Sequence, residues 1–251
     1  MAEVILVVLQ RTAAAPALLT AAERLAELAG GAHLSVLAAA AESIPQLRAA
    51  FARWQARPRP EPLPVRWHEA PGEPEAAIVA RGSRADLIVA ARPRDDDSPA
   101  VQVGFRAALL QSDRPVLVVP PEDVFRDALR TFGRRVAIAW REDVHTTRVV
   151  LPALRYVAAA EAVFVLAGMR PGRPIPAMPA LLAERRVAAE MHLLPIGPGG
   201  LGEDLIDKVH ELHADLLVMG AFAHTRLHDL VYGGVTRHVL ACADLPVLMR
   251  F

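Results

Sequence analysis

The sequence predicts two α/β domains in tandem, each an open five-stranded parallel sheet with helices on both faces. The first observation is that Ala85-Asp86-Leu87-Ile88-Val89 returns as Ala214-Asp215-Leu216-Leu217-Val218, 129 residues later from Asp86 to Asp215. The second is that Asp113-Arg114-Pro115-Val116-Leu117 returns as Asp244-Leu245-Pro246-Val247-Leu248, 131 residues later. Two matches in one order and at nearly one shift indicate two copies of one unit. The third observation is the alternation of strands and helices, which is typical of right-handed βαβ crossovers.

Each copy begins with a continuous apolar run, which suits a parallel strand that is covered on both faces. In the first copy we expect strands at Val4–Leu9, His33–Ala38, Val65–His68, Asp86–Ala90 and Pro115–Val119, with helices at Pro16–Leu28, Ile44–Gln55, Glu73–Arg81 and Val103–Gln111. In the second copy we expect strands at Arg135–Trp140, Val163–Ala167, Glu190–Leu194, Leu216–Met219 and Pro246–Met249, with helices at His145–Ala158, Pro179–Arg186, Glu203–His213 and Arg226–Ala241. Pro120-Pro121 ends the first unit and Gly133 precedes the second, which predicts domains at 1–121 and 133–251.

Composition and charge exclude several classes of partner. The chain has 53% hydrophobic residues, enough to fill a core, and 28 basic residues balance 28 acidic ones. With no net charge, no global field favours nucleic acid or an anionic membrane. The amino terminus has no basic segment and no apolar run approaches the roughly 20 residues that span a bilayer, so we expect a cytoplasmic protein. Cys242 is the single cysteine; it allows no intramolecular disulfide, and we expect it to be buried.

A glycine-rich loop raises the question of a dinucleotide-binding enzyme. Gly197, Gly199 and Gly202 follow the pattern G-x-G-x-x-G. In a dinucleotide-binding fold this pattern follows the first strand, whereas here it precedes the third helix of the second copy. The acidic ribose ligand that should end the next strand is also absent, since that strand closes with Met219-Gly220-Ala221. We therefore reject that interpretation and read the loop as a strand-to-helix connection.

A second glycine pattern lies after the fourth strand of the second copy, where open parallel sheets bind ligands. This stretch, from Gly220 to Thr236, resembles the universal stress protein family, whose nucleotide-binding members carry Gly-x2-Gly-x9-Gly-Ser/Thr here. Gly220 matches the first glycine and Gly233 the third, while Ala223 replaces the second glycine and Gly234 the Ser/Thr. The resemblance extends over both halves and implies a tandem universal stress protein with the adenine nucleotide alpha hydrolase-like architecture.

The resemblance implies a site for ATP or another adenine nucleotide. Small residues matter because backbone N–H groups cradle phosphate oxygens only where no side chain intervenes. The implied site comprises Gly220, Ala223, His224, Gly233, Gly234, Val235, Thr236 and Trp140. Thr236 is the candidate replacement for the missing hydroxyl. Arg141 stands where the family has an aspartate for the adenosine, and Glu142 or Asp143 could serve in its place after a short shift.

The remaining polar residues form no recognisable catalytic set. After its fourth strand the first copy carries Asp95-Asp96-Asp97, which we read as a solvated loop in preference to a cation site. His210 and His213 are three residues apart instead of the four of the zinc motif, and His224 and His228 are read as surface residues. No nucleophile, base and oxyanion hole assemble, so we expect no strong catalysis and no metal.

Three functions stay open at this point. The leading hypothesis is a stress-response protein that senses an adenine nucleotide in its second domain. The alternatives are an interaction scaffold that has lost nucleotide binding and, with less support, a slow ATPase or hydrolase. We expect the two domains to pair within the chain through their fifth strands, Pro115–Val119 and Pro246–Met249, because such apolar edges would otherwise be exposed. A homodimer and a protein partner are compatible with this organisation.

Overall fold

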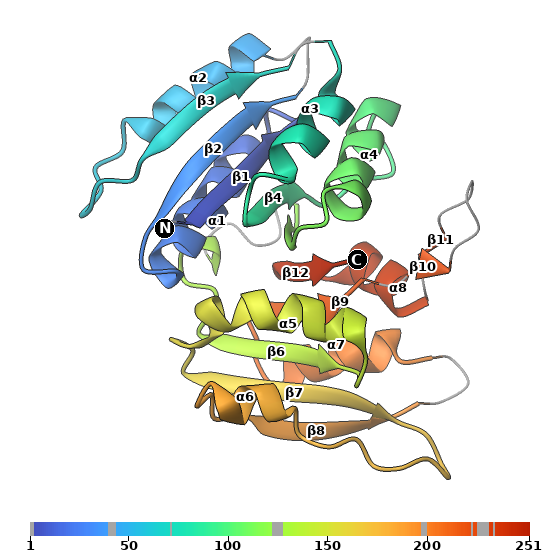
Figure 1. The fold of residues 1–251 in the computed structure, drawn as a ribbon. Coiled ribbons are helices and arrows are strands. Elements are labelled where there is room, and N and C mark those ends of the chain that lie inside the picture. Colours follow the sequence, from blue (N-terminus) through green and yellow to red (C-terminus); the bar gives the residue numbers. More distant parts are fainter. Residues whose placement is uncertain are drawn as a thin grey trace. The chain divides into compact units, whose positions relative to one another are not determined.

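The computed structural model describes residues 3–39, 44–70, 72–121, 128–196, 200–221, 223–224, 231–232 and 234–251. The chain divides into two compact units, Met1–Thr131 and Phe132–Phe251 (Figure 1). This division falls inside the segment 120–133, where the sequence places the joint between the domains.

The first unit is a parallel α/β sheet with strand order β3-β2-β1-β4-β5. Its strands are β1 (Glu3–Leu9), β2 (Ala32–Ala38), β3 (Val65–Glu69), β4 (Leu87–Ala91) and β5 (Val116–Val119). Its helices are α1 (Ala15–Leu28), α2 (Ile44–Gln55), α3 (Pro74–Gly82) and α4 (Pro99–Arg106), the last continuing as the π-helical turn η2 (Ala107–Gln111), with a 3-10 turn, η3 (Ala128–Arg130), near the end.

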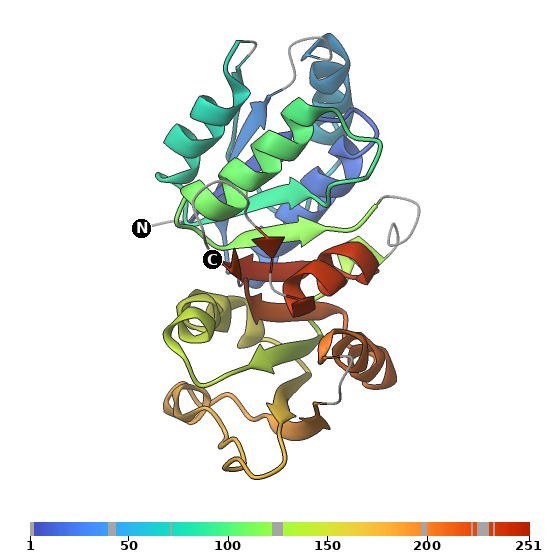
Figure 2. The same cartoon turned by 90° about the vertical axis from the view of Figure 1, so that its right-hand side faces the viewer.

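The second unit repeats this arrangement with strand order β8-β7-β6-β9-β12, again all parallel. Its strands are β6 (Arg135–Trp140), β7 (Ala162–Met169), β8 (Glu190–Pro195), β9 (Leu216–Gly220) and β12 (Val247–Arg250). Its helices are α5 (Val144–Val157), α6 (Ala180–Glu184), α7 (Gly202–Glu211) and α8 (Gly234–Cys242). Figure 2 shows α5 and α6 on one face of this sheet and α7 and α8 on the other. The α/β class and the parallel sheets predicted from the sequence are confirmed.

The aspartates of the repeated Ala-Asp-Leu motif, Asp86 and Asp215, bind the backbone at the start of the first strand of their units. Asp86 accepts a hydrogen bond from the backbone N–H of Val4 at 2.9 Å, at the start of β1. Asp215 accepts bonds from the N–H groups of Gly133 at 2.8 Å and Arg135 at 3.1 Å, at the start of β6. Burial raises the pKa of Asp215, although these backbone donors act in the opposite direction. The repeat therefore includes the carboxylate that fixes the first strand of each sheet.

Two predicted helices begin more than one residue away from their expected starts. Helix α4 starts at Pro99 instead of Val103, since proline suits the first turn of a helix. The helix expected from Arg226 to Ala241 is wrong in its first part: Val231–Tyr232 is the short strand β11, antiparallel to β10 (Ala223–His224), and α8 begins only at Gly234. A β-branched residue followed by an aromatic one favours a strand, and two consecutive glycines disfavour a helix interior.

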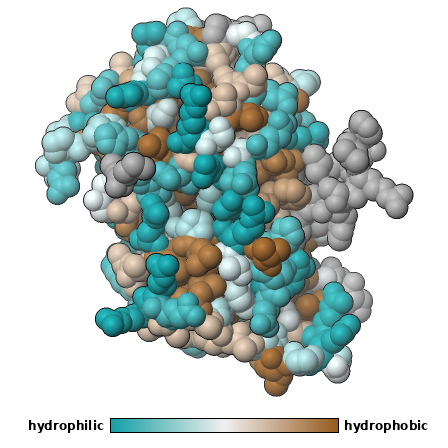
Figure 3. All heavy atoms as spheres, in the orientation of Figure 1, coloured by the Kyte–Doolittle hydropathy of each residue, from teal (hydrophilic) through white to brown (hydrophobic). Residues whose placement is uncertain are grey.

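The surface of the described residues is mixed in character. Hydrophobic side chains gather over α5 on the face drawn in Figure 3. Two hydrophobic residues of this helix, Val144 and Leu151, are exposed. Cys242 is also exposed, at the end of α8, so the expectation of a buried cysteine is wrong. None of the described helices is long and apolar enough to cross a membrane.

Candidate ligand-binding cleft in the second unit

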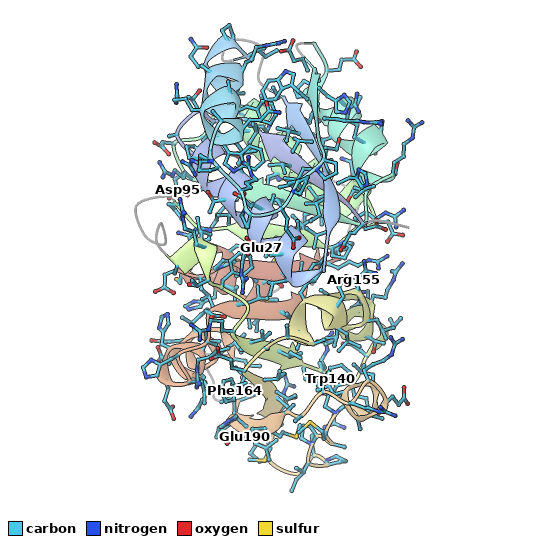
Figure 4. The ribbon with its side chains drawn as sticks, turned by 90° about the vertical axis from the view of Figure 1, so that its left-hand side faces the viewer. Glu27, Asp95, Trp140, Arg155, Phe164 and Glu190 are labelled. Carbon is cyan, nitrogen blue, oxygen red and sulfur yellow. The ribbon has the colours of Figure 1, made fainter. Side chains whose placement is uncertain are left out.

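The end of β6 supplies the first wall of the site. Trp140 is the last residue of this strand and is half-buried; Figure 4 shows it at the opposite end of the sheet from Phe164 and Glu190. Strand β6 lies between β7 and β9, and the chain passes from β6 outward to β7 and β8 before it returns to β9. The order of strands therefore reverses beside β6, and a crevice beyond the carboxyl ends of the strands is expected there.

The turn after β6 contains Glu142 and Asp143, the two carboxylates that the sequence offered as alternatives for contact with the adenosine, and the structure gives them different positions. Asp143 is the N-cap of α5, and its carboxylate accepts a hydrogen bond from the N–H of Thr146 at 2.8 Å. Burial raises its pKa, but the bonds from Thr146 and Arg141 outweigh burial, and the pKa is lowered overall. Arg141 forms an ion pair with Asp143. Asp143 is thus committed to the helix, whereas Glu142 lines the cleft described below.

Helix α8 supplies the opposite wall. Its first residue, Gly234, is exposed, and a Cβ built on it would meet no atom of a described residue within 4 Å. Helices α7 and α8 approach closely, because a Cβ on Gly202 would lie 2.8 Å from the Cβ of His238. Gly168 at the end of β7 allows a similar approach, with the Cδ1 of Ile196 at 2.7 Å from the position of its Cβ. These glycines bring the ends of the elements together around an open space.

The open space is a cleft of about 1050 Å³ within the second unit. Its described lining comes from the ends of β6, β7 and β8, from the loop after β7, from the start of α7 and from α8: Trp140, Arg141, Glu142, Gly168, Arg170, Arg173, Pro174, Ile175, Pro176, Ile196, Gly200, Leu201, Gly202, Glu203, Gly234, Val235, Arg237, His238 and Ala241. Four arginines face two glutamates, so the lining carries an excess of positive charge. This balance favours an anionic ligand.

The structure places the predicted site residues unevenly. Trp140, Gly234 and Val235 line the cleft. Gly220 is buried at the end of β9 opposite Arg250 of β12, and Thr236 is 0% exposed; neither is among the lining residues. Ala223 and His224 form β10 by their backbone, and Gly233 lies outside the described residues, as do Arg226 and His228.

Sequence reasoning missed part of the lining. Gly200, with a φ of +92°, and Gly202 belong to the glycine loop that was rejected as a dinucleotide fingerprint, yet both line the cleft. Arg170 and Arg173 follow β7 directly. The signal that could have found all four is their place after the carboxyl ends of two parallel strands.

At the corresponding edge of the first unit, a buried carboxylate pairs with an arginine. Arg11 follows β1 as Arg141 follows β6, and its Nη1 donates to both carboxylate oxygens of Asp97 at 2.9 and 3.0 Å. Asp97 lies in the loop after β4, accepts a further bond from the N–H of Arg94 at 2.7 Å, and has a side chain only 5% exposed. Asp95 and Asp96 are exposed as expected, but the reading of Asp97 as a solvated carboxylate is wrong.

Metal binding gains no support from the described histidines. His210 pairs with Asp244 through its Nε2 at 2.8 Å. In the part of the chain that the structure describes, no group of three or more histidine, cysteine, aspartate or glutamate side chains could hold a metal ion.

Comparison with known proteins matches one segment of the chain to a family model and the whole chain to a known fold. Residues 196–249, which include the glycine loop and α8, match the model of the universal stress protein family. No match was found among curated proteins. The chain resembles the crystal structure of a universal stress protein from Archaeoglobus fulgidus DSM 4304, with 12% identity over 98% of this chain and 97% of that one, and a TM-score of 0.65.

Two other solved structures share the fold. A protein of unknown function from Pseudomonas aeruginosa PAO1 is 16% identical over 99% of this chain and 92% of that one, with a TM-score of 0.62. The cytoplasmic domain of a prokaryotic cation chloride cotransporter is 13% identical over 99% and 95%, with a TM-score of 0.51. At these identities the likeness concerns the fold alone.

Proposed function

We propose that this member of the universal stress protein family binds an adenine nucleotide in the cleft of its second unit and acts as a stress-response sensor without strong catalysis. The observation that carries the proposal is the arginine-rich cleft at the carboxyl ends of β6, β7 and β8. Within the described residues Arg170, Arg173 and Arg237 form no side-chain hydrogen bond or ion pair, so their guanidinium groups are available to a ligand.

The parts of the cleft suit the parts of a nucleotide. Arg237 lies in the first turn of α8, near Gly234, where the absence of a side chain leaves room for a phosphate close to the backbone. A guanidinium group binds phosphate through paired N–H donors. The indole of Trp140 offers an aromatic surface on which an adenine ring can stack. The supported ligands are therefore ATP, ADP and AMP.

An interaction scaffold of the same fold is the second candidate. It is favoured by Arg141, which occupies the place where the family resemblance implies an aspartate, and by the commitment of Asp143 to the cap of α5. A slow ATPase has less support, since the described lining offers only Glu142 and Glu203 as carboxylates and no metal-binding group accompanies them.

We also propose that the two units pair within the chain through their fifth strands. The reason is physical: β5 and β12 consist almost entirely of apolar residues, each is the last strand in the order of its own unit, and an unpaired apolar edge strand would promote aggregation. Further dimerisation of whole chains and a protein partner are extensions of this proposal.

The binding proposal is tested by titrating the full chain with ATP, ADP and AMP in a calorimeter. Arg237→Gln should weaken binding by about tenfold, which corresponds to about 1.4 kcal/mol. Arg185→Gln is the matched control, because Arg185 is exposed in the same unit and lies outside the cleft. Equal affinities of the two variants would show that the ligand does not contact Arg237 of α8. Absence of nucleotide binding by the wild type would favour the interaction scaffold.

A further inference from the structure

The loop between β7 and α6 forms a wall of the cleft, and a nucleotide with phosphate only at α8 would leave the arginines of this wall without a partner. Arg170, Arg173, Pro174, Ile175 and Pro176 line this wall. The loop leads to α6, which covers one face of the sheet, whereas Arg237 belongs to α8 on the other face (Figure 2). The cleft therefore receives arginines from two sides, with the end of β6 as part of its lining.

The sequence Arg170-Pro171-Gly172-Arg173 encodes the geometry of this wall. The N–H of Arg173 donates to the carbonyl oxygen of Arg170 at 3.1 Å, and Gly172 has a φ of +74°. Proline followed by a glycine of positive φ, closed by a bond between the outer residues, is the pattern of a type II β-turn. Such a turn keeps the Cα atoms of its outer residues within about 7 Å, so the two arginines are held as neighbours.

Nothing within the described chain compensates this pair of like charges. Neither arginine forms a side-chain hydrogen bond or ion pair with a described residue. The next residues are also unusual for a free surface, because Ile175 is 69% exposed between two prolines. Two neighbouring cations on a fixed turn, beside rigid apolar side chains, form a place for an anionic group.

We propose that the turn of Arg170 and Arg173 is a second anion subsite, and that the cleft takes an adenine nucleotide with two phosphate groups at separate positions. This inference rests on the proposed function, since it assumes a nucleotide at α8. One phosphate lies at Gly234 and Arg237, and the second lies at the turn. A volume of about 1050 Å³ is at the upper end of the roughly 300–1,000 Å³ typical of small-molecule sites and accommodates such a ligand.

The test compares two ligands that contain the same groups. ADP carries two phosphates in one chain, whereas adenosine 3′,5′-bisphosphate carries them on opposite sides of the ribose. Calorimetry with the full chain should show at least roughly tenfold tighter binding of the bisphosphate, because charge-assisted hydrogen bonds to a second phosphate are strong. The double variant Arg170→Gln/Arg173→Gln should remove this preference, so that the variant binds the bisphosphate no more tightly than it binds ADP.

The controls separate this inference from the proposed function. Arg185→Gln removes an exposed arginine of the same unit and should keep the preference for the bisphosphate. If wild-type protein binds ADP and the bisphosphate equally, the second subsite is refuted while nucleotide binding stands. If the double variant keeps the preference, the turn is not the subsite. If neither ligand binds, both proposals fail.

Discussion

Replacement of Asp97 by alanine should destabilise the first unit, because this carboxylate ties the loop after β4 to the loop after β1. Its two oxygens accept bonds from Nη1 of Arg11, and one of them also accepts the N–H of Arg94. The side chains are 5% exposed for Asp97 and 17% exposed for Arg11, so both charges are largely removed from water. In the variant the guanidinium of Arg11 keeps its hydrogen bond to the carbonyl oxygen of Arg92, at 3.0 Å, but loses its anionic partner.

The expected cost is about 3 kcal/mol. Loss of one partner of a buried ion pair costs roughly 3–5 kcal/mol, and the partial exposure of Arg11 places this case at the low end. Asp97→Asn should cost less, since an amide oxygen can still accept the N–H of Arg94. Asp95→Ala, in the same loop but exposed, should change the stability by no more than about 0.5 kcal/mol.

Urea unfolding followed by tryptophan fluorescence measures this effect. Trp54 and Trp67 lie in the first unit and Trp140 in the second, so a Trp140→Phe background reports the first unit alone. With a slope of about 2 kcal/mol per molar urea, a loss of about 3 kcal/mol moves the midpoint down by about 1.5 M. Coincident midpoints for Asp97→Ala and Asp95→Ala would refute the assignment of Asp97 to a buried, stabilising pair.

Gly202→Ala should destabilise the second unit by about 1–3 kcal/mol in thermal unfolding, because its Cβ would collide with α8, whereas Gly234→Ala should be tolerated; equal effects would contradict the close approach. Asp143→Ala should cost about 1 kcal/mol at neutral pH. Because the folded pKa of Asp143 is lowered, this contribution is present above the unfolded pKa and is lost as the pH falls through the folded value, so a difference that persists in acid would argue against the cap. Finally, residues 1–125 and 130–251 expressed separately should associate in analytical ultracentrifugation; two stable monomers that ignore each other would contradict the pairing of the units.

The sheets could be predicted because their signals are local and repeated. Arg135–Trp140 and Ile44–Gln55 have the predicted bounds, and the other sheet strands differ from their predicted ends by at most two residues. The apolar runs of parallel strands are continuous, and the second copy confirms the assignment of the first. The prediction for the segment before α8 was wrong because its apolar residues fit a helical pattern. The strand preference of Val231-Tyr232 and the glycines that follow instead favour the short strand β11.

The candidate site could be predicted only where one segment carries the signal. Trp140, Gly234 and Val235 follow from the motif and its place in the fold. In the first unit, Arg11 pairs with Asp97 across 86 residues of sequence, and no local sequence pattern predicts such a distant pair. The Arg-Pro-Gly-Arg turn is readable as a turn from its sequence. Its position on the cleft depends on the neighbouring strands, which periodicity alone does not locate in space.

The ligand content of the purified protein tests whether the second unit holds an adenine nucleotide beside Gly234. Wild-type chain and Gly234→Val are purified in parallel and denatured, and the released small molecules are quantified by mass spectrometry. Among the described residues the valine Cβ meets no atom within 4 Å, so the variant should fold, and its side chain would occupy space at a position that lines the cleft. We predict that the wild type releases an adenine nucleotide and that the folded variant releases at least tenfold less. A wild type without nucleotide, or equal amounts from both proteins, would contradict the claim.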